Sequence, residues 1–260
     1  MLDKRSLHLG TERRPRIYIP AARFCRSNQV RAQMLAEKIA VASTIVSETL
    51  SFRPREVGVM LRAIYALEPV AAAAGLVLAM PAMVVLAAWI AVLARRSPLV
   101  RHHRIGWRGA ALPMLKFRTM WSRDAVPGPI FTIEDVSDYI PEAKQLGDPR
   151  VSSRFAAWCR RWSLDELPQL YHVMRGEMSI VGPRPITRGE LETHYGSSVR
   201  EVLSLRPGLV GLWQVMGRNH LTYARRRRLD LLLVRRVSAA LYFRILVRAI
   251  SKVLCGHGAY

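Results

Sequence analysis

Cysteine and acid are both scarce in this chain of 260 residues. The three cysteines, Cys25, Cys159 and Cys255, form no C-x-x-C pair, and the seven histidines show no H-E-x-x-H spacing. The pattern therefore indicates neither a disulfide framework nor a zinc site. The first 31 residues are polar and rich in arginine, without the apolar core of a cleavable secretory signal. We therefore expect the soluble part of the chain to stay in the cytoplasm.

The shortage of acid leaves a formal net charge of +21, since 40 lysines and arginines face 19 aspartates and glutamates. An excess of this size predicts a polyanionic partner: nucleic acid, an anionic bilayer surface or a phosphorylated substrate. Nucleic-acid binders place aromatic side chains among basic ones so that bases can stack, and the basic run 225–228 lacks such aromatics. We therefore expect anionic membrane lipids and phosphates as partners, and no nucleic acid.

One long apolar stretch, residues 69–94, contains no ionisable side chain and is long enough to cross a membrane as a helix. Pro81 lies in its middle, where a proline removes a helical hydrogen bond and kinks the axis. Arginines flank the stretch on both sides, with Arg53, Arg55 and Arg62 before it and Arg95, Arg96, Arg101 and Arg104 after it. Because a spanning helix carries its basic residues mostly on the cytoplasmic side, we predict that both ends are cytoplasmic.

These features divide the chain into three parts. Residues 1–52 are a basic leader of unknown role, in which 27–50 has a helix-forming composition. Residues 53–96 are predicted to be a membrane module, a re-entrant helix broken at Pro81. Residues 97–260 are predicted to be a small cytoplasmic domain of mixed α/β class, with helices and a short sheet. An ordinary spanning helix and a buried core helix are the alternatives to re-entry.

Two adjacent carboxylates, Asp165 and Glu166, follow the arginine pair Arg160-Arg161. Ser163 and Glu166 fit an S-x-x-E capping box, in which the serine accepts from helix amides and the glutamate reaches back. That structural role is the alternative to a functional one, but a capping box uses only Ser163 and Glu166 and gives Asp165 no structural role. A carboxylate near a positive helix N-terminus stays ionised, and it can then attack phosphorus or bind a metal.

Further cations stand in positions suited to holding phosphate. The strand-like run 111–120 places Lys116 and Arg118 on one face at a period of two residues. Arg184 lies between two prolines that restrict the backbone, so its guanidinium is presented at low entropic cost. A solvated strand face and a rigid surface turn are the alternatives.

Two more segments have readable patterns. Residues 126–148 combine prolines, glycines and acids, which predicts a loop with a short helix. Residues 206–215 read as a basic, glycine-rich turn followed by an apolar strand.

Several of these patterns occur together and in order. The motifs are Lys116-Phe117-Arg118-Thr119-Met120, Asp148-Pro149-Arg150, Ser163-Leu164-Asp165-Glu166-Leu167-Pro168-Gln169-Leu170, Gly176-Glu177-Met178-Ser179-Ile180-Val181-Gly182-Pro183-Arg184-Pro185 and Pro207-Gly208-Leu209-Val210-Gly211-Leu212-Trp213-Gln214. Together they resemble the bacterial sugar transferases, the monotopic phosphoglycosyl transferases that charge a polyprenyl phosphate with a sugar phosphate. The resemblance runs from about Arg62 to Tyr260 and excludes residues 1–52.

The resemblance implies a catalytic domain that works in two steps on the cytoplasmic face of the bacterial inner membrane. Asp165 would attack the sugar-linked phosphorus of a UDP-sugar, expel uridine monophosphate and carry the sugar phosphate as an acyl phosphate. Undecaprenyl phosphate would then accept it, which begins exopolysaccharide or other glycoconjugate synthesis. Glu166 would hold Mg²⁺. The cations expected to offset phosphate charge are Lys116, Arg118, Arg160 and Arg184.

The chain also departs from the family pattern. The asparagine usual after the Asp-Glu motif is His172, and the acid near the start of the membrane helix is Glu68. The Gln-Glu of the following basic motif is His102-His103, and residues 231–238 replace an aromatic-rich, acidic stretch. The ending 256–260 is similar to that of members that transfer galactose or glucose phosphate, which favours a hexose.

These departures leave two other functions open. One is a weakly active or inactive relative that serves as a membrane scaffold in polysaccharide assembly, although the retention of Asp165 and Glu166 argues against it. The other is a membrane-attached nucleic-acid binder, against which the missing aromatics argue. The sequence also leaves a homo-oligomer open.

Overall fold

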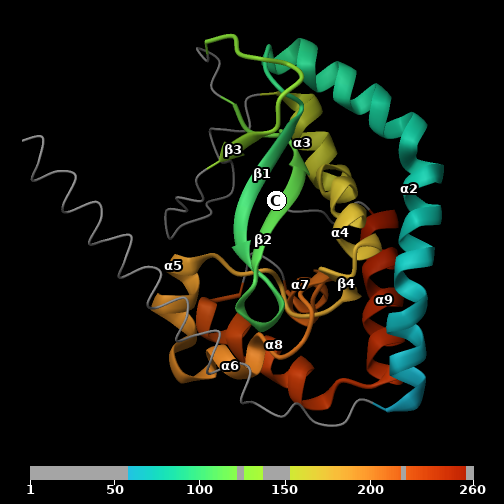
Figure 1. Ribbon diagram of the computed structural model, residues 1–260, viewed down its shortest axis with the longest axis vertical. Coiled ribbons are helices and arrows are strands. Elements are labelled where there is room, and N and C mark those ends of the chain that lie inside the picture. The colour runs from blue at the N-terminus through green and yellow to red at the C-terminus, as the bar shows by residue number, and fades with distance from the viewer. Residues whose placement is uncertain (1–57, 122–125, 137–152, 218–220, 256–260) are drawn as a thin grey trace, which may run out of the picture. The chain divides into compact units, whose positions relative to one another are not determined.

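The computed structural model describes residues 58–121, 126–136, 153–217 and 221–255 (Figure 1). The predicted leader with its helix at 27–50, the Asp148-Pro149-Arg150 motif, most of the predicted loop 126–148 and the ending 256–260 lie outside the described residues. The described residues all belong to one unit, in which a long helix lies alongside two small sheets and a set of shorter helices.

Helix α2, Val59–Ala94, contains the predicted membrane stretch. Alanine, leucine and valine dominate it, and no ionisable side chain follows Glu68 within it. The helix continues through Pro69 and Pro81, and its ribbon bends without turning back on itself (Figure 1). The predicted break at Pro81 is therefore not confirmed, because a proline can kink a helix while the turns on either side keep their hydrogen bonds.

The apolar surface of α2 is largely open. Its exposed large apolar side chains are Val59, Met60, Leu67, Val70, Val77, Leu78, Met80, Val84, Val85, Trp89, Val92 and Leu93. Within the part of the chain that the structure describes, α2 is the one helix long and apolar enough to cross a membrane. Its exposure excludes the alternative of a buried core helix and marks a membrane or interaction face.

Three strands form the first sheet, in the order β2-β1-β3. Strand β1, Leu99–Ile105, runs antiparallel to β2, Ala111–Phe117, and parallel to β3, Glu134–Val136. The strand predicted over 111–120 is confirmed over 111–117 and ends before Arg118. Strand β3 corrects the prediction of a loop there, because its three residues pair through the backbone and carry no hydrophobic alternation that a sequence pattern could reveal.

A run of short helical elements carries the paired carboxylates. Helix α3, Arg154–Arg161, is followed by the 3-10 helix η2, Leu164–Gln169, and by α4, Leu170–Met174. Ser163 takes a left-handed conformation at the start of η2, and its side chain makes no capping hydrogen bond. The predicted capping box is therefore wrong, because an N-cap serine needs an extended backbone to aim its hydroxyl at the helix amides.

The second sheet brings two glycine-containing turns together. Strand β4, Ser179–Val181, is parallel to β5, Gly208–Val210. The two backbones approach so closely that a side chain on Gly182 or Gly208 would overlap the neighbouring strand. The apolar strand predicted to reach residue 215 ends at Val210, and helix α7, Leu212–Met216, replaces its second half.

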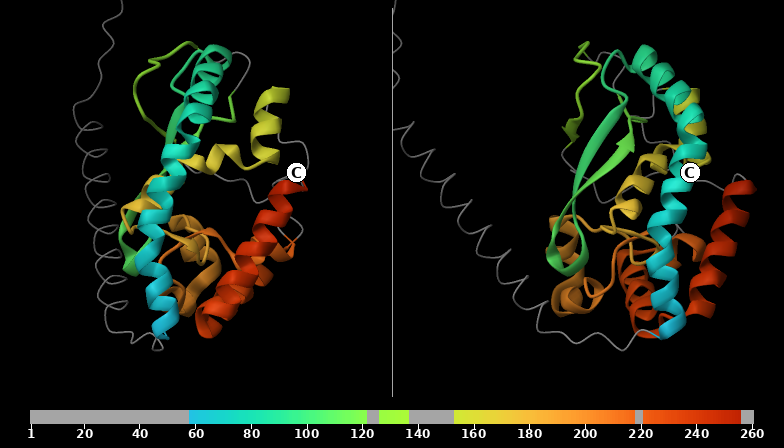
Figure 2. Two further views of the ribbon diagram at one scale, coloured as in Figure 1. Left: turned by 90° about the vertical axis from the view of Figure 1, so that its right-hand side faces the viewer. Right: turned by 45° about the vertical axis from the view of Figure 1, so that its right-hand side comes forward.

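The C-terminal helices complete the core. Helix α8, Tyr223–Arg236, leads into α9, Ala239–Leu254, which lies beside the first half of α2 in both views of Figure 2. Their shared core contains Leu61 of α2, Leu233 of α8 and Ile245 of α9. The remaining short helical elements are η1 Trp107–Gly109, α5 Arg188–Glu190, η3 Leu191–Tyr195, η4 Gly196–Ser198 and α6 Val199–Val202.

Candidate active site

The paired carboxylates lie on η2, where Asp165 is buried and Glu166 is half-buried. The chain enters η2 through Ser163, whose φ of 55° lies in the left-handed region. A non-glycine residue held there costs about 1–3 kcal/mol, and such residues cluster at functional sites. The tight turn separates η2 from α3 and turns Asp165 inward.

Opposing effects set the ionisation of Asp165. Burial raises the pKa of this carboxyl above its ordinary value, and the neighbouring charge of Glu166 raises it further. The positive charges of Lys116 and Arg160 lower the pKa and so oppose the burial. These cations therefore help to keep a buried carboxylate ionised, which is the form that can attack an electrophile.

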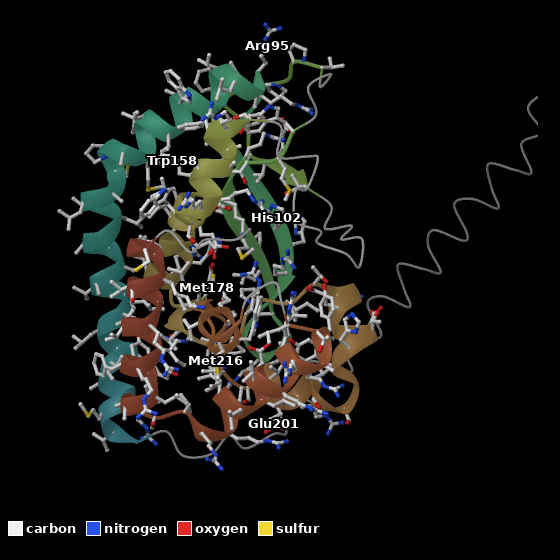
Figure 3. All side chains as sticks on the ribbon, turned by 180° about the vertical axis from the view of Figure 1, so that it is seen from behind. Arg95, His102, Trp158, Met178, Glu201 and Met216 are labelled. Carbon is white, nitrogen blue, oxygen red and sulfur yellow. The ribbon has the colours of Figure 1, made fainter. Side chains whose placement is uncertain are left out.

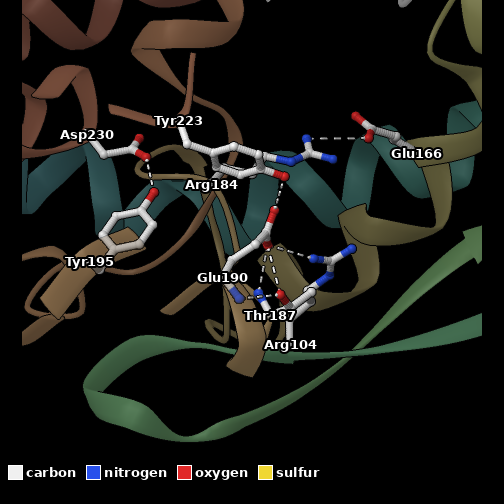
Figure 4. Close-up of polar contacts among 8 residues, drawn as sticks. All are labelled: Arg104, Glu166, Arg184, Thr187, Glu190, Tyr195, Tyr223 and Asp230. Atoms are coloured by element: carbon white, nitrogen blue, oxygen red, sulfur yellow. Dashed lines mark hydrogen bonds and ion pairs between the residues drawn. The ribbon is translucent and has the colours of Figure 1, made fainter. Parts of the chain in front are cut away.

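Glu166 is held by cations from two other elements. The Lys116 Nζ atom, at the end of β2, lies 2.8 Å from the Glu166 Oε1 atom. The Arg184 Nη1 atom lies 3.9 Å from the same oxygen and comes from the turn after β4 (Figure 4). The sites predicted at 116, 165, 166 and 184 thus converge, although they are far apart in sequence.

Arg118 has a different environment from Lys116. It is buried, its Nε atom donates to the Ser97 carbonyl at 2.7 Å, and its Nη2 atom lies 3.0 Å from a Glu134 carboxylate oxygen. Strand β2 ends at Phe117, so the period-two alternation that predicted a shared face does not continue to Arg118. The structure therefore does not bring the two cations into one cradle, and Arg118 ties β3 to the sheet.

Arg184 is positioned by a ring contact, and its positive charge lowers the pKa of the nearby Asp230 carboxyl. Its guanidinium lies over the ring of Trp213, 5.7 Å from the centroid. The guanidinium of Arg226 also lies over the Trp213 ring, 4.8 Å from the centroid. Burial raises the pKa of Asp230 to about 7, although the hydroxyl of Tyr195 donates to it at 2.9 Å.

A second carboxylate, that of the half-buried Glu190, lies beside this turn. Glu190 accepts hydrogen bonds from the Thr187 amide and hydroxyl at 3.0 Å, and its oxygens lie 3.3 Å from Arg104 and from the Tyr223 hydroxyl (Figure 4). Burial alone would raise the pKa of Glu190, but the Thr187 amide and Arg104 lower it below its ordinary value. Glu190 therefore stays ionised close to Arg184.

The sequence analysis missed Glu190 and Asp230. The T-x-x-E pattern at 187–190 was a readable signal, because Thr187 and Glu190 do form a reciprocal capping box. Asp230 had no such signal, since an aspartate on a helix is ordinarily exposed.

Aromatic side chains connect the site to the long helix. Phe155 of α3 lies between Trp89 of α2 and Trp158, with ring centroids 6.1 Å and 5.8 Å apart. Figure 3 labels Trp158 on the side of α3 that faces α2. Because α3 carries Arg160 in its last turn, the position of this cation depends on packing against the apolar helix.

Of the two carboxylates, Glu166 has the chemistry of a magnesium ligand. Among the described residues, no group of three histidines, cysteines or acids gathers as a complete metal cage. Mg²⁺ does not need one, because it is commonly bound by one or two carboxylates, water and substrate phosphates. Glu166, which is the more exposed of the pair, offers such an oxygen.

A family model and several known proteins match this chain. The model of the family described as bacterial sugar transferase matches residues 61–256. The exopolysaccharide production protein ExoY of Rhizobium meliloti is 37% identical over 219 residues, which are 83% of this chain and 94% of that protein. The chain therefore belongs to the bacterial sugar transferase family.

Two further relatives have names that describe a reaction. The UDP-galactose-lipid carrier transferase of Erwinia amylovora is 38% identical over 188 residues, which are 70% of this chain and 38% of that protein. The undecaprenyl-phosphate galactose phosphotransferase of Salmonella typhimurium is 36% identical over 189 residues, which are 71% of this chain and 39% of that protein. This chain thus spans under two fifths of these two relatives. It is an enzyme of the phosphoglycosyl transferase class.

Proposed function

We propose that this enzyme transfers a hexose 1-phosphate from a UDP-sugar to undecaprenyl phosphate, as the initiating step of exopolysaccharide or other glycoconjugate synthesis. The observation that carries the proposal is the buried Asp165 carboxylate beside Glu166. The positive charges of Lys116 and Arg160 lower its pKa and so favour its ionised form. The names of relatives support the donor and acceptor, since they include a UDP-galactose-lipid carrier transferase and an undecaprenyl-phosphate galactose phosphotransferase.

In the first step, an Asp165 carboxylate oxygen forms a bond to the sugar-linked phosphorus of the donor. The bond from that phosphorus to the bridging oxygen breaks, and uridine monophosphate leaves with the electron pair. In the second step, a phosphate oxygen of the lipid attacks the same phosphorus and releases the Asp165 carboxylate. Two in-line displacements on one phosphorus atom need a nucleophile that is ionised but shielded from water, as a buried carboxylate flanked by cations is.

The cations position the donor and offset its charge. Arg184 reaches Glu166 from the turn after β4, where a diphosphate could contact both this guanidinium and Lys116. Glu166 would hold Mg²⁺ together with the diphosphate oxygens. When bound, the ion supplies charge neutralisation at the phosphoryl group. Arg118 contributes indirectly, because its contacts with Ser97 and Glu134 hold the end of β2.

The membrane brings the acceptor to the site. Helix α2 presents an exposed apolar surface and packs against α3 through Trp89. Insertion of α2 into the membrane therefore places η2, with Asp165 and Glu166, close to the membrane–water interface. We place the catalytic domain on the cytoplasmic face of the bacterial inner membrane, where UDP-sugars are available, with the flanking arginines near anionic lipid headgroups. A lipid phosphate at the interface can then meet the phosphorylated Asp165.

The proposal is tested by release of uridine monophosphate from UDP-galactose and UDP-glucose, with Mg²⁺ and undecaprenyl phosphate. Asp165→Asn should lose turnover by about three orders of magnitude or more, because an amide is not a nucleophile towards phosphorus. Asp135→Asn, a matched change at an exposed aspartate of β3, should keep the wild-type rate.

Three outcomes would contradict parts of the proposal. Full activity of Asp165→Asn would exclude the covalent aspartyl intermediate. Turnover with N-acetylated sugar nucleotides alone would exclude a hexose donor. Donor binding by the wild-type protein without any turnover would favour a scaffold.

A further inference from the structure

Strand β2, which carries Lys116, has one edge that no described strand covers. In the sheet order β2-β1-β3, β2 pairs only with β1 among the described strands, so backbone groups on its other edge need other partners. The Leu115 amide is one of them, and it donates to the Nε2 atom of His172 at 3.1 Å. A side chain of α4 therefore takes the place of a neighbouring strand directly before Lys116.

This contact defines the state of the His172 ring. Because Nε2 accepts a hydrogen bond, it carries no hydrogen, and the neutral ring must carry its hydrogen on Nδ1. The Nδ1 atom lies 2.7 Å from a Glu177 carboxylate oxygen, which accepts that hydrogen. Glu177 is in turn held by Arg175, whose Nε atom donates to the other oxygen at 2.7 Å. The buried ring is thus fixed at both nitrogens.

The two ends of this connection both lead to the catalytic centre. His172 lies on α4, which continues directly from the η2 turn that holds Asp165 and Glu166. Leu115 is followed by Lys116, whose Nζ atom lies 2.8 Å from the Glu166 Oε1 atom. The positive charge of Lys116 also favours the ionised form of Asp165. The hydrogen bond between Leu115 and His172 therefore joins the element that carries the carboxylates to the strand that carries their cation.

We propose that His172, in its neutral form with the hydrogen on Nδ1, is a positioning residue that holds Lys116 against the catalytic carboxylates. The inference rests on the proposed function for its kinetic consequences, whereas the ring state is independent of activity. A second hydrogen on Nε2 would set two donors against each other and break the connection to β2. The chain uses Glu177 to hold the ring in the accepting form.

The test compares two substitutions at this position. His172→Gln can place an amide oxygen close to the position of Nε2 and keep an acceptor for the Leu115 amide, whereas His172→Leu fills the site without one. We expect His172→Leu to lower kcat about tenfold or more, with KM for the UDP-sugar changed less than about threefold, because a small misplacement affects the reacting groups most. His172→Gln should recover most of kcat.

Recovery of kcat in His172→Gln is the readout that loss of packing alone would not give, because only glutamine restores an acceptor for the Leu115 amide. His103→Leu, at an exposed histidine of β1, is the matched control and should leave kcat unchanged.

Nitrogen-15 NMR of the wild-type histidine side chains, with His172 assigned by its loss in His172→Gln, reads the ring state directly. The expected result is a neutral ring with hydrogen on Nδ1; hydrogen on Nε2 would overturn the proposal even if His172→Leu fails to fold. Wild-type rates in a folded His172→Leu would also overturn it. Absence of turnover in the wild type would instead contradict the proposed function, and the NMR result would still decide the ring state.

Discussion

At the scale of single residues, the site combines carboxylates with different environments. Burial raises the pKa of Asp165, and the positive charges of Lys116 and Arg160 partly offset this rise by stabilising the ionised carboxylate. Glu190 is half-buried, and hydrogen bonds from Thr187 together with the charge of Arg104 lower its pKa. Asp230 accepts a hydrogen bond from the Tyr195 hydroxyl and lies near the charge of Arg184, and burial still raises its pKa to about 7. The number and charge of the donors decide which carboxyl ionises most readily.

Asp230 predicts a pH dependence of stability. Its pKa is about 7 in the folded protein and lies about three units lower in an unfolded chain, so the folded state binds more protons between these values. The free energy of unfolding should therefore fall as pH rises from 4 to 7, by at most about 1.4 kcal/mol per pH unit from this group.

Asp230→Asn removes the titrating group, so the variant should lose this part of the slope. The measurement is denaturant unfolding of both proteins in detergent across that pH range. Asp135→Asn, at an exposed site, should keep the wild-type slope. Parallel curves for wild type and Asp230→Asn would contradict the prediction.

At the scale of elements, one buried acid connects three of them. Glu68 lies on α2, and its Oε1 atom accepts from the Ser179 hydroxyl at 2.7 Å, the Ile180 amide at 2.8 Å and the Tyr242 hydroxyl at 2.7 Å. Ser179 and Ile180 belong to β4, which precedes the Arg184 turn, and Tyr242 belongs to α9. The apolar helix is thus attached to the catalytic core by polar contacts as well as by packing.

Removal of this acceptor should loosen α2 from the core. Glu68→Ala leaves buried donors without a partner at about 1–3 kcal/mol each, so we expect the melting temperature in detergent to fall by about 5 °C or more. Glu68→Gln keeps an oxygen at the Oε1 position and should lose much less. Glu192→Ala, at an exposed acid, is the control. Equal melting temperatures for Glu68→Ala and the control would show that the contacts contribute nothing.

At the scale of the whole molecule, the arrangement proposed for α2 in a bilayer decides on which side its two ends would lie. The helix is continuous and has an exposed apolar surface beyond Pro69, which by itself suits a spanning helix. The catalytic domain follows its C-terminal end, and α9 and β4 pack against its N-terminal half. If α2 crossed the bilayer, its C-terminal end and the elements packed against its N-terminal half would lie on opposite sides of the membrane. These elements belong to one domain, so we favour re-entry.

Cysteine labelling separates the two arrangements. Single cysteines at Arg62 and Arg96, in a chain whose natural cysteines are replaced, should both react with a membrane-impermeant reagent only after the cytoplasmic face is opened. A cysteine at Ser51, ahead of the helix, should react in the same way as the one at position 62. Reaction of positions 62 and 96 from opposite faces would establish a spanning helix and contradict re-entry.

Local patterns predicted several parts of this molecule correctly. The long helix follows from a run of apolar residues without ionisable side chains, and β2 follows from alternation over 111–117. The family resemblance rested on short motifs, and the family model confirms it over 61–256. These features were readable because each depends on residues that are neighbours in sequence.

Other features depend on contacts between distant segments. Arg118 was expected beside Lys116, but β2 ends one residue before it and its guanidinium binds Ser97 and Glu134 instead. Ser163 was expected to cap η2, but it has a left-handed backbone conformation and its side chain makes no capping hydrogen bond. Its conformation belongs to the tight turn between α3 and η2. The acceptor role of His172 exists only because α4 meets the edge of β2 that no described strand covers.

The amino-acid sequence by itself thus determined the apolar helix, the strand β2, the basic charge and the carboxylate pair, since periodicity and composition are local properties. Only the tertiary structure decided which cation faces Glu166, which acids stay ionised and which nitrogen of His172 accepts a hydrogen bond. The physical reason is that burial and hydrogen-bond partners come from segments far apart in the chain, and their effect changes with shifts of a single residue or a few ångströms.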